Sequence, residues 1–179
     1  MYYKTGWFLK KKNNLEYRHT NEWEIIDIVR ILNSLGFVVD IVDRGALDFN
    51  PTDKYQLFIG LAAGDSGRHY KKYADMLPSA IKVALCAGPE PKLSAQLVQE
   101  QYARFNLRHK SNLPTMREPT IDFDSFAKSS DALLVIGEEG QFCYESYKRH
   151  NMPIYSYLPG CSNEIRFLYQ WISMRDRTK

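Results

Sequence analysis

Cysteine is scarce in this sequence: there are three in 179 residues, at positions 86, 143 and 161. The count is odd, the three lie far apart, and no pair has the C-x-x-C spacing. A disulfide framework or a zinc ribbon needs paired or closely spaced cysteines, so neither is predicted. We expect Cys86, at the end of an apolar run, to be a small core residue.

Long apolar runs are also missing. The longest covers residues 132–136, far below the ~20 residues that a membrane-spanning helix needs. The apolar piece at residues 7–9 is shorter than the core of a signal peptide. We therefore expect a cytoplasmic protein with no transmembrane segment. The lysines at positions 10–12 leave peripheral contact with an anionic membrane surface as an alternative, although a solvated charge run explains them as well.

Neither sign of charge dominates the chain. It has 24 Lys and Arg residues against 21 Asp and Glu, a net charge of +3, and the basic residues are scattered. Nucleic-acid binding usually shows as a basic stripe or patch, so we expect none. The chain has 44% hydrophobic and 13% aromatic residues, and its length is that of a single domain. This composition predicts one soluble domain that binds a small ligand or a protein.

Two phosphate-binding patterns are absent, namely G-x-G-x-x-G and the P-loop. Their absence argues against a free-standing dehydrogenase or P-loop enzyme. The four histidines, at positions 19, 69, 109 and 150, do not have the spacing of metal ligands. No metal site and no resident cofactor are predicted.

The first clear element is a helix that begins at Asn21. Asn21 and Glu24 have the spacing of a capping box, in which each side chain bonds a free amide of the first turn. Gly36 follows where a left-handed C-cap is expected. Residues 37–42 are mostly apolar and rich in β-branched side chains, which predicts a strand buried on both faces. Between the caps, apolar residues recur at helical spacing: Ile25, Ile28, Val29, Leu32 and Leu35.

Strands and helices then alternate along the chain. Strands are predicted at 55–61, 81–85, 132–137 and 154–158, helices at 68–77, 93–107 and 141–150, and a proline-containing loop at 111–119. Such alternation implies right-handed crossovers. The predicted fold class is α/β, with a doubly wound, mostly parallel sheet in three αβα layers. Ligands of such sheets bind at the carboxyl ends of the strands.

The loop that follows strand 55–61 contains Gly64 and Ser66. The string Gly-Asp-Ser-Gly is similar to the nucleophile segment of chymotrypsin-like proteases, which are disulfide-rich β-barrels, and it does not fit the G-x-S-x-G elbow. A serine hydrolase that uses Ser66 with a histidine such as His69 is therefore the weakest hypothesis. The preferred interpretation is a turn whose amides meet a phosphate or a sugar hydroxyl, with a plain loop as the alternative.

Two further loops follow strands at the same edge. Gly88 and Glu90 come after strand 81–85, and Gly137 and Glu138 come after strand 132–137. These four residues are candidates for ligand binding, although for Glu90 the interpretation that follows is preferred. The alternative for Glu90 is a first-turn acid that the helix dipole favours, and the same caution applies to Glu138.

His19 and Asn21 open the first helix, so their polar groups should face the same edge of the sheet. Capping alone explains Asn21, whereas His19 is not needed for the cap. Both are candidates for ligand binding, with a surface position as the alternative for His19. The sequence alone identifies no catalytic residues.

Several segments together resemble the N-terminal half of bacterial GT-B glycosyltransferases of the large retaining family called group 1. They are residues 19–24 (HTNEWE), 36–43, 55–60, the Ala87-Gly88 turn with its helix, 130–137 and 154–160. The resemblance covers most of the chain through motifs of moderate specificity. It implies a Rossmann-like single domain at residues 1–160, equivalent to one half of a GT-B enzyme, with 161–179 as a tail or the start of a linker.

The resemblance also implies a function. The N-terminal half holds the acceptor, here a sugar or a lipid-linked acceptor of polysaccharide biosynthesis, and a C-terminal half holds the nucleotide-sugar donor as co-substrate, without a metal. The expected partner is a donor-binding domain or a second copy, and catalysis by this chain alone is not expected. The alternative function is a non-catalytic interaction module that recruits a partner through Arg166, Phe167, Tyr169 and Trp171.

Overall fold

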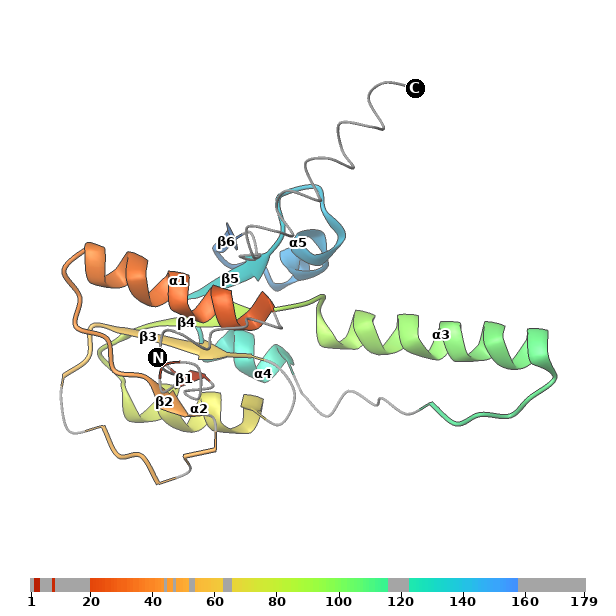
Figure 1. Cartoon of the computed structure of the whole chain (residues 1–179), viewed down its shortest axis with the longest axis horizontal. Helices are drawn as coiled ribbons and strands as arrows, with labels where there is room; N and C mark the ends of the chain where they lie inside the picture. The colour runs from red at the N-terminus through yellow and green to blue at the C-terminus, as the bar shows by residue number, and fades with distance from the viewer. Residues whose placement is uncertain are drawn as a thin grey trace, which may run out of the picture.

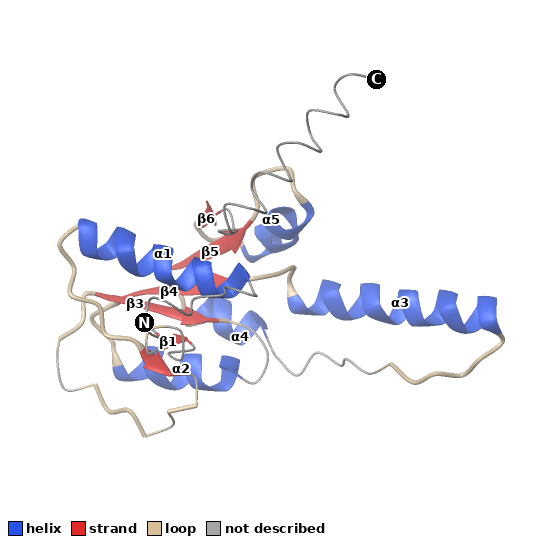
Figure 2. Cartoon of the chain, viewed as in Figure 1, coloured by secondary structure: helices blue, strands red, loops and turns tan. Residues whose placement is uncertain are grey.

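The structure, a computed structural model, contains a parallel β-sheet with helices packed against it (Figures 1 and 2). It describes residues 2–3, 8, 20–43, 45–46, 48–51, 54–62, 66–115 and 123–157, with the backbone alone at 2–3, 20–23 and 66–68. The strands are β1 (Tyr2–Tyr3), β2 (Val42–Asp43), β3 (Leu57–Leu61), β4 (Ile81–Cys86), β5 (Ala132–Ile136) and β6 (Ile154–Tyr157). The helices are α1 (Thr20–Ser34), α2 (Ser66–Met76), α3 (Pro91–His109), α4 (Phe123–Lys128), α5 (Phe142–Tyr147) and the 3-10 turn η2 (Lys148–His150).

Within the described residues the strand order is β2-β1-β3-β4-β5-β6, and every pair is parallel. β1 lies between β2 and β3, so the chain progresses in opposite directions on its two sides. Ligands of doubly wound sheets bind outside the carboxyl ends of the strands at such a switch point. The α/β class and the parallel sheet are thus confirmed. The sequence did not reveal β1, because two residues are too few to show periodicity.

The sheet buries apolar side chains on both faces. Along β3 and β4 these side chains alternate between two clusters, as the period of two along a strand requires. One cluster contains Phe58, Ala84 and Cys86 with side chains of α2, α4 and α5. The other contains Ile59, Leu61 and Leu85 with side chains of α1. Figure 1 shows α1 and α2 on opposite sides of β3 and β4.

The boundaries of α1 follow from local sequence with one exception. Gly36 ends the helix at φ +89°, and the amide of Phe37 donates to the carbonyl of Leu32, so the predicted left-handed C-cap is confirmed. The prediction of a capping box at Asn21 and Glu24 is wrong. The helix begins at Thr20, and the Glu24 carboxylate makes no hydrogen bond back to the first turn.

The strand predicted at residues 37–42 is shorter than expected. Only Val42 and Asp43 pair, with Tyr2 and Tyr3 of β1, while residues 37–41 have no strand assignment. Val38 is 95% exposed, so burial on both faces is wrong for this segment. The physical reason is that β1 pairs only with Val42 and Asp43, and no other described strand lies beside residues 37–41.

Helix α3 begins as predicted and then leaves the body of the domain. Its 19 residues include no buried side chain, and Figure 1 shows it extending away from the sheet. Asn106 closes its far end by accepting from Leu113 at 2.9 Å and donating back at 3.0 Å. The return segment 111–115 is a loop, as predicted, and it precedes the short helix α4, which the sequence did not predict.

No helix among the described residues has the length and apolarity to cross a membrane. Cys86 and Cys143 are free thiols, and Cys161 lies outside the described residues. Cys86 is 1% exposed at the end of β4, so its predicted role in the core is confirmed. Burial raises its pKa to about 12, which keeps this thiol neutral and unreactive.

Candidate functional site

The first turns of α1 lie at the carboxyl ends of the central strands. Because α1 connects two parallel strands, β1 and β2, it begins at the carboxyl edge of the sheet and returns to the amino edge. Ile25 belongs to the same cluster as Leu61 and Leu85, near the ends of β3 and β4, and Ala87 packs against that cluster. Glu24 precedes Ile25 and is therefore carried to the edge where ligands of this fold class bind.

Glu24 is 3% exposed, and neither of its carboxylate oxygens has a hydrogen-bond partner among the described residues. No lysine, arginine or histidine of the described residues forms an ion pair with it. Burial raises the pKa of this carboxyl above the usual range of glutamate. A buried acceptor left unsatisfied costs about 1–3 kcal/mol, so Glu24 destabilises the unliganded fold. Buried acids with raised pKa values at a crevice are typical of functional sites.

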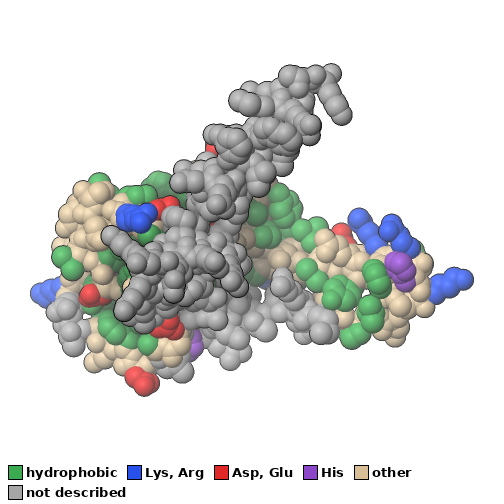
Figure 3. All heavy atoms as spheres, in the orientation of Figure 1, with side chains coloured by type: hydrophobic (Ala, Val, Ile, Leu, Met, Phe, Trp, Pro, Cys, Tyr) green, Lys and Arg blue, Asp and Glu red, His purple; other side chains and the backbone are tan. Residues whose placement is uncertain are grey.

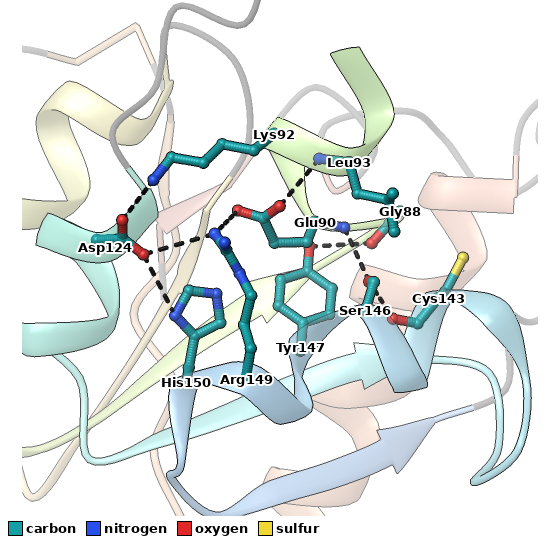
Figure 4. A network of polar contacts seen from close by, with 10 residues as sticks. All are labelled: Gly88, Glu90, Lys92, Leu93, Asp124, Cys143, Ser146, Tyr147, Arg149 and His150. Carbon is teal, nitrogen blue, oxygen red and sulfur yellow. Dashed lines mark hydrogen bonds and ion pairs between the residues drawn. The ribbon is translucent and has the colours of Figure 1, made fainter. Parts of the chain in front are cut away.

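A network of polar contacts centres on Glu90, at the carboxyl end of β4 (Figure 4). The Glu90 Oε2 atom accepts from the amide of Leu93 at 3.0 Å and so caps α3. Its Oε1 atom lies 2.7 Å from Arg149 Nη2, which η2 contributes after β5. The Glu90 amide donates to Ser146 Oγ at 3.0 Å. Glu90 is 1% exposed, and both of its oxygens are bonded within the protein.

Asp124 of α4 joins the same network from a third element. Its carboxylate lies 2.5 Å from Lys92 Nζ, 3.5 Å from Arg149 Nη2 and 3.6 Å from His150 Nδ1. The hydrogen bond from Lys92 is the main reason that the pKa of Asp124 is lowered. Burial and the adjacent Arg149 lower the pKa of His150, with Glu90 and Asp124 opposing them. These contacts hold α3, α4 and η2 together at the ends of β4 and β5.

Gly88 forms the turn between β4 and Glu90. Its carbonyl accepts from the Tyr147 hydroxyl at 3.0 Å, and burial is the main reason that the pKa of Tyr147 is raised. A Cβ atom added at Gly88 would meet no atom within 4 Å, so the turn borders open space. The turn is therefore anchored on one side and accessible on the other.

The loop after β5 lies beside that turn, because β4 and β5 are neighbours in the sheet. Gly137 has a φ of +95°, which an L side chain rarely adopts. Gln141 folds back and accepts from the amide of Glu138 at 3.1 Å, and Glu145 accepts from the amide of Gly140 at 2.7 Å. The side chain of Glu138 is exposed at the rim of this edge.

The structure thus brings some predicted residues together. Gly88 and Glu90 lie in one loop and Gly137 and Glu138 in the neighbouring one, both at the carboxyl edge. Of the other candidates, Asn21 lies in the first turn of α1 and Ser66 begins α2, with only their backbone described, and His19 and Gly64 lie outside the described residues.

No protein-family model, curated protein or solved structure matches this chain.

The functional interpretation therefore depends on the site itself. Sequence reasoning treated Glu24 as a capping residue, because its spacing from Asn21 fits that motif. It also missed Arg149 and Asp124, which lie 59 and 34 positions after Glu90 in the chain. No local pattern could have paired them with Glu90. The sequence did offer one signal for Glu24. This acidic residue directly precedes Ile25, on a face of α1 that is otherwise apolar.

The described side chains at this edge offer hydrogen-bonding groups. Among the described residues, no group of histidine, cysteine, aspartate and glutamate could hold a metal ion. The carboxylate of Glu24 has unused acceptor capacity, whereas Glu90 has both oxygens engaged. Of these two buried acids, Glu24 is therefore the one whose oxygens are not already engaged by donors of the described residues.

Proposed function

We propose that this chain is the acceptor-binding domain of a glycosyltransferase, with a three-layer, Rossmann-like arrangement equivalent to one half of a GT-B enzyme. The observation that carries the proposal is the buried carboxylate of Glu24, whose two oxygens have no hydrogen-bond partner in the part of the chain that the structure describes. A carboxylate accepts hydrogen bonds from two donors at once, and a sugar offers neighbouring hydroxyl groups at suitable distance. The ligand is therefore a sugar or a lipid-linked sugar.

The energetics favour a neutral, hydroxyl-bearing ligand. Within the described part of the chain no donor compensates the desolvated carboxylate of Glu24, and burial raises its pKa. Hydroxyl donors from a ligand replace the hydrogen bonds with water that Glu24 lost on folding. Hydrogen bonding to the charged form lowers the pKa of Glu24 again, so ligand binding releases a proton wherever the unliganded residue is protonated.

The position in the sheet supports the same proposal. Glu24 lies in the first turns of α1, at the carboxyl edge of the sheet, and the order of the strands changes direction around β1, the strand that α1 follows. The segment 19–24 that contains Glu24 also carries the resemblance to group 1 glycosyltransferases. In this proposal the nucleotide-sugar donor binds a second domain that faces the carboxyl edge, and sugar transfer occurs between the two.

The experiment is a screen of the fluorescently labelled 179-residue protein on an array of mono- and oligosaccharides, followed by saturation-transfer NMR with the sugars that bind. We expect binding of at least one sugar class by the wild type and a loss of at least about tenfold in affinity for Glu24→Gln. Glu100→Gln, on the exposed surface of α3, removes the same charge far from the site and should bind like the wild type.

Two results would overturn the proposal. One is the absence of sugar binding by a wild-type protein that is folded by circular dichroism. The other is sugar binding that Glu24→Gln leaves unchanged. Binding of a nucleotide sugar such as UDP-glucose in place of simple sugars would reassign the site from acceptor to donor.

A second candidate function, a non-catalytic interaction module, is favoured by helix α3. The helix has no buried side chain, and Phe105, Leu107 and Leu113 are exposed near its far end. Figure 3 shows hydrophobic side chains along this arm and basic ones near its tip. The C-terminal residues that first suggested this function lie outside the described residues.

The interaction module is tested by self-association. Sedimentation of the wild type over a range of concentrations should reveal a dimer, and the double substitution Phe105→Ser with Leu107→Ser should remove it. Because neither side chain is buried, the variant should remain folded. A wild type that stays monomeric at all concentrations would count against this second function and leave the sugar-binding proposal intact.

A further inference from the structure

The far end of helix α3 combines exposed apolar side chains with a local excess of positive charge. Residues 101–115 include three lysines and arginines but no aspartate or glutamate, whereas the whole chain is nearly balanced, with 24 basic and 21 acidic residues. Figure 3 shows Lys and Arg side chains together with hydrophobic ones toward the end of this arm. We call the following exposed side chains the arm tip: Arg104, Phe105, Leu107, Arg108, Lys110 and Leu113.

The backbone of the arm tip is stabilised by Asn106. Lys110 ends α3 in the left-handed region at φ 49°, and its amide donates to the carbonyl of Asn106. The Asn106 side chain accepts from the amide of Leu113 at 2.9 Å and donates to the carbonyl of Leu113 at 3.0 Å. Leu113 is thereby brought back beside Phe105, with which it lines a hollow of about 300 Å³. A hydrogen-bonded turn thus presents the side chains of the tip.

Apolar side chains lie on opposite sides of the helix at the arm tip. Successive residues of an α-helix are about 100° apart around its axis, so Phe105 and Leu107 are about 160° apart. Arg104 and Arg108 are about one turn apart and lie between these two directions on one side of the helix. Leu107 is 84% exposed and Phe105 is 45% exposed. A partner that packs along one side of α3 would therefore cover only one of the two apolar side chains.

We propose that the arm tip docks end-on onto the surface of a bilayer that contains anionic lipids. Its basic side chains, Arg104, Arg108 and Lys110, contact the negative headgroups, which attract them within about one Debye length. Phe105 and Leu107 enter the boundary between headgroups and acyl chains on both sides of the helix, since a bilayer surrounds the end that it receives. The 19 residues of α3 span about 28 Å, which gives the arm its reach beyond the sheet.

The chemistry of the arm tip favours a bilayer over two other partners. A second copy of this chain would bring two sets of like charges together and cover one side of each helix. A nucleic acid would pair its phosphates with the basic side chains, but its backbone offers no apolar surface to Leu107 or Leu113. A bilayer has negative headgroups and apolar acyl chains at adjacent depths, which matches the combination of side chains at the tip.

The test is flotation of the full 179-residue protein with vesicles of equimolar phosphatidylcholine and phosphatidylserine. We expect saturable binding that added salt weakens, because salt screens the attraction between the basic side chains and the headgroups. Binding to vesicles of phosphatidylcholine alone should be at least about tenfold weaker. Amide hydrogen exchange of the vesicle-bound protein should slow at residues 107–113 and stay unchanged in β4 and β5.

Charge variants test the electrostatic part of the proposal. Arg104→Gln with Arg108→Gln should weaken binding to the anionic vesicles at least about tenfold. The control, Arg30→Gln with Lys71→Gln, removes two exposed charges from α1 and α2 and should bind like the wild type. All four side chains lie at the surface, so both double variants should fold, as circular dichroism would verify.

Apolar variants test the end-on geometry. Phe105→Ser and Leu107→Ser should each weaken binding to the anionic vesicles at least about fivefold, because each removes apolar area that enters the bilayer. The control is Ile31→Ser, which removes an exposed apolar side chain from α1 and should bind like the wild type. A partner that covers one side of α3 would instead be sensitive to only one of the two substitutions at the tip.

Four results would overturn the proposal: no binding to the anionic vesicles, equal binding to vesicles of phosphatidylcholine alone, equal effects of the two double charge variants, or a loss of binding in only one of Phe105→Ser and Leu107→Ser. Tighter binding of a DNA duplex than of the vesicles would also overturn it and assign the arm tip to nucleic acid. Sugar binding is measured without vesicles and concerns Glu24, so membrane docking and the proposed function can fail independently.

Discussion

The contact between Glu90 and Arg149 gives the sharpest stability prediction, because its two members differ in exposure. The Glu90 side chain is 2% exposed, whereas that of Arg149 is 46% exposed and also lies 3.5 Å from Asp124. Removing the arginine leaves a buried carboxylate with a single hydrogen bond, to the amide of Leu93. Removing the carboxylate instead leaves an arginine with access to water and to a second acid.

The magnitudes follow from that asymmetry. Breaking a fully buried pair costs about 3–5 kcal/mol, and since Arg149 is half exposed we expect about 2–3 kcal/mol for Arg149→Met. Glu90→Gln keeps the shape and an oxygen for the cap of α3, so it should cost only about 1 kcal/mol. The double variant should cost no more than Arg149→Met alone, which corresponds to a coupling of at least about 1 kcal/mol.

The assay is urea unfolding followed by circular dichroism at neutral pH for the wild type, the two single variants and the double variant. Lys148→Met is the control, since Lys148 is the exposed neighbour of Arg149 and its ion pairs with Glu139 and Glu145 lie at the surface. Its unfolding midpoint should stay close to that of the wild type. Equal losses for Glu90→Gln and Arg149→Met, or losses that simply add in the double variant, would refute the reasoning.

Three further predictions concern single side chains. Gly60→Ala should lose about 1–3 kcal/mol of unfolding free energy in urea, because a Cβ atom there would lie 2.5 Å from the buried ring of Tyr70. The control is Gly88→Ala, whose Cβ atom would meet open space and should leave the unfolding free energy unchanged. Glu24 has a raised pKa, so its stabilising contribution is complete below the unfolded pKa and is lost as pH rises through the folded pKa. Glu24→Gln should therefore gain about 1 kcal/mol over the wild type at neutral pH and lose that advantage in acid, as urea midpoints across pH would measure; a constant difference would contradict this. Leu107→Ala should change the melting temperature little, because the side chain is 84% exposed and surface changes are usually within about 0.5 kcal/mol.

Local elements were largely predictable from the sequence. The spacing of Ile25, Ile28 and Leu32 predicted α1, and the glycine at position 36 predicted its end, since both depend on neighbouring residues alone. Glu90 was expected either at a ligand crevice or as a helix-start acid. Its hydrogen bond to Leu93, three residues away, agrees with the second interpretation.

Long-range relations were not predictable in the same way. Arg149 meets Glu90 only because β4 and β5 are adjacent and parallel, a pairing that no local pattern encodes. The prediction of a strand at residues 37–42 was wrong for a related reason. A strand needs a neighbour as well as a suitable composition, and β1 provides one only at Val42 and Asp43.

By itself, the sequence determined the α/β class, the alternation of strands and helices and the glycine that ends α1, because hydrophobic periodicity and capping act over a few residues. The tertiary structure alone decided the order of the strands and the burial of Glu24 with no hydrogen-bond partner among the described residues. These features depend on which distant segments share an edge of the sheet, and that choice is made by packing of the whole domain.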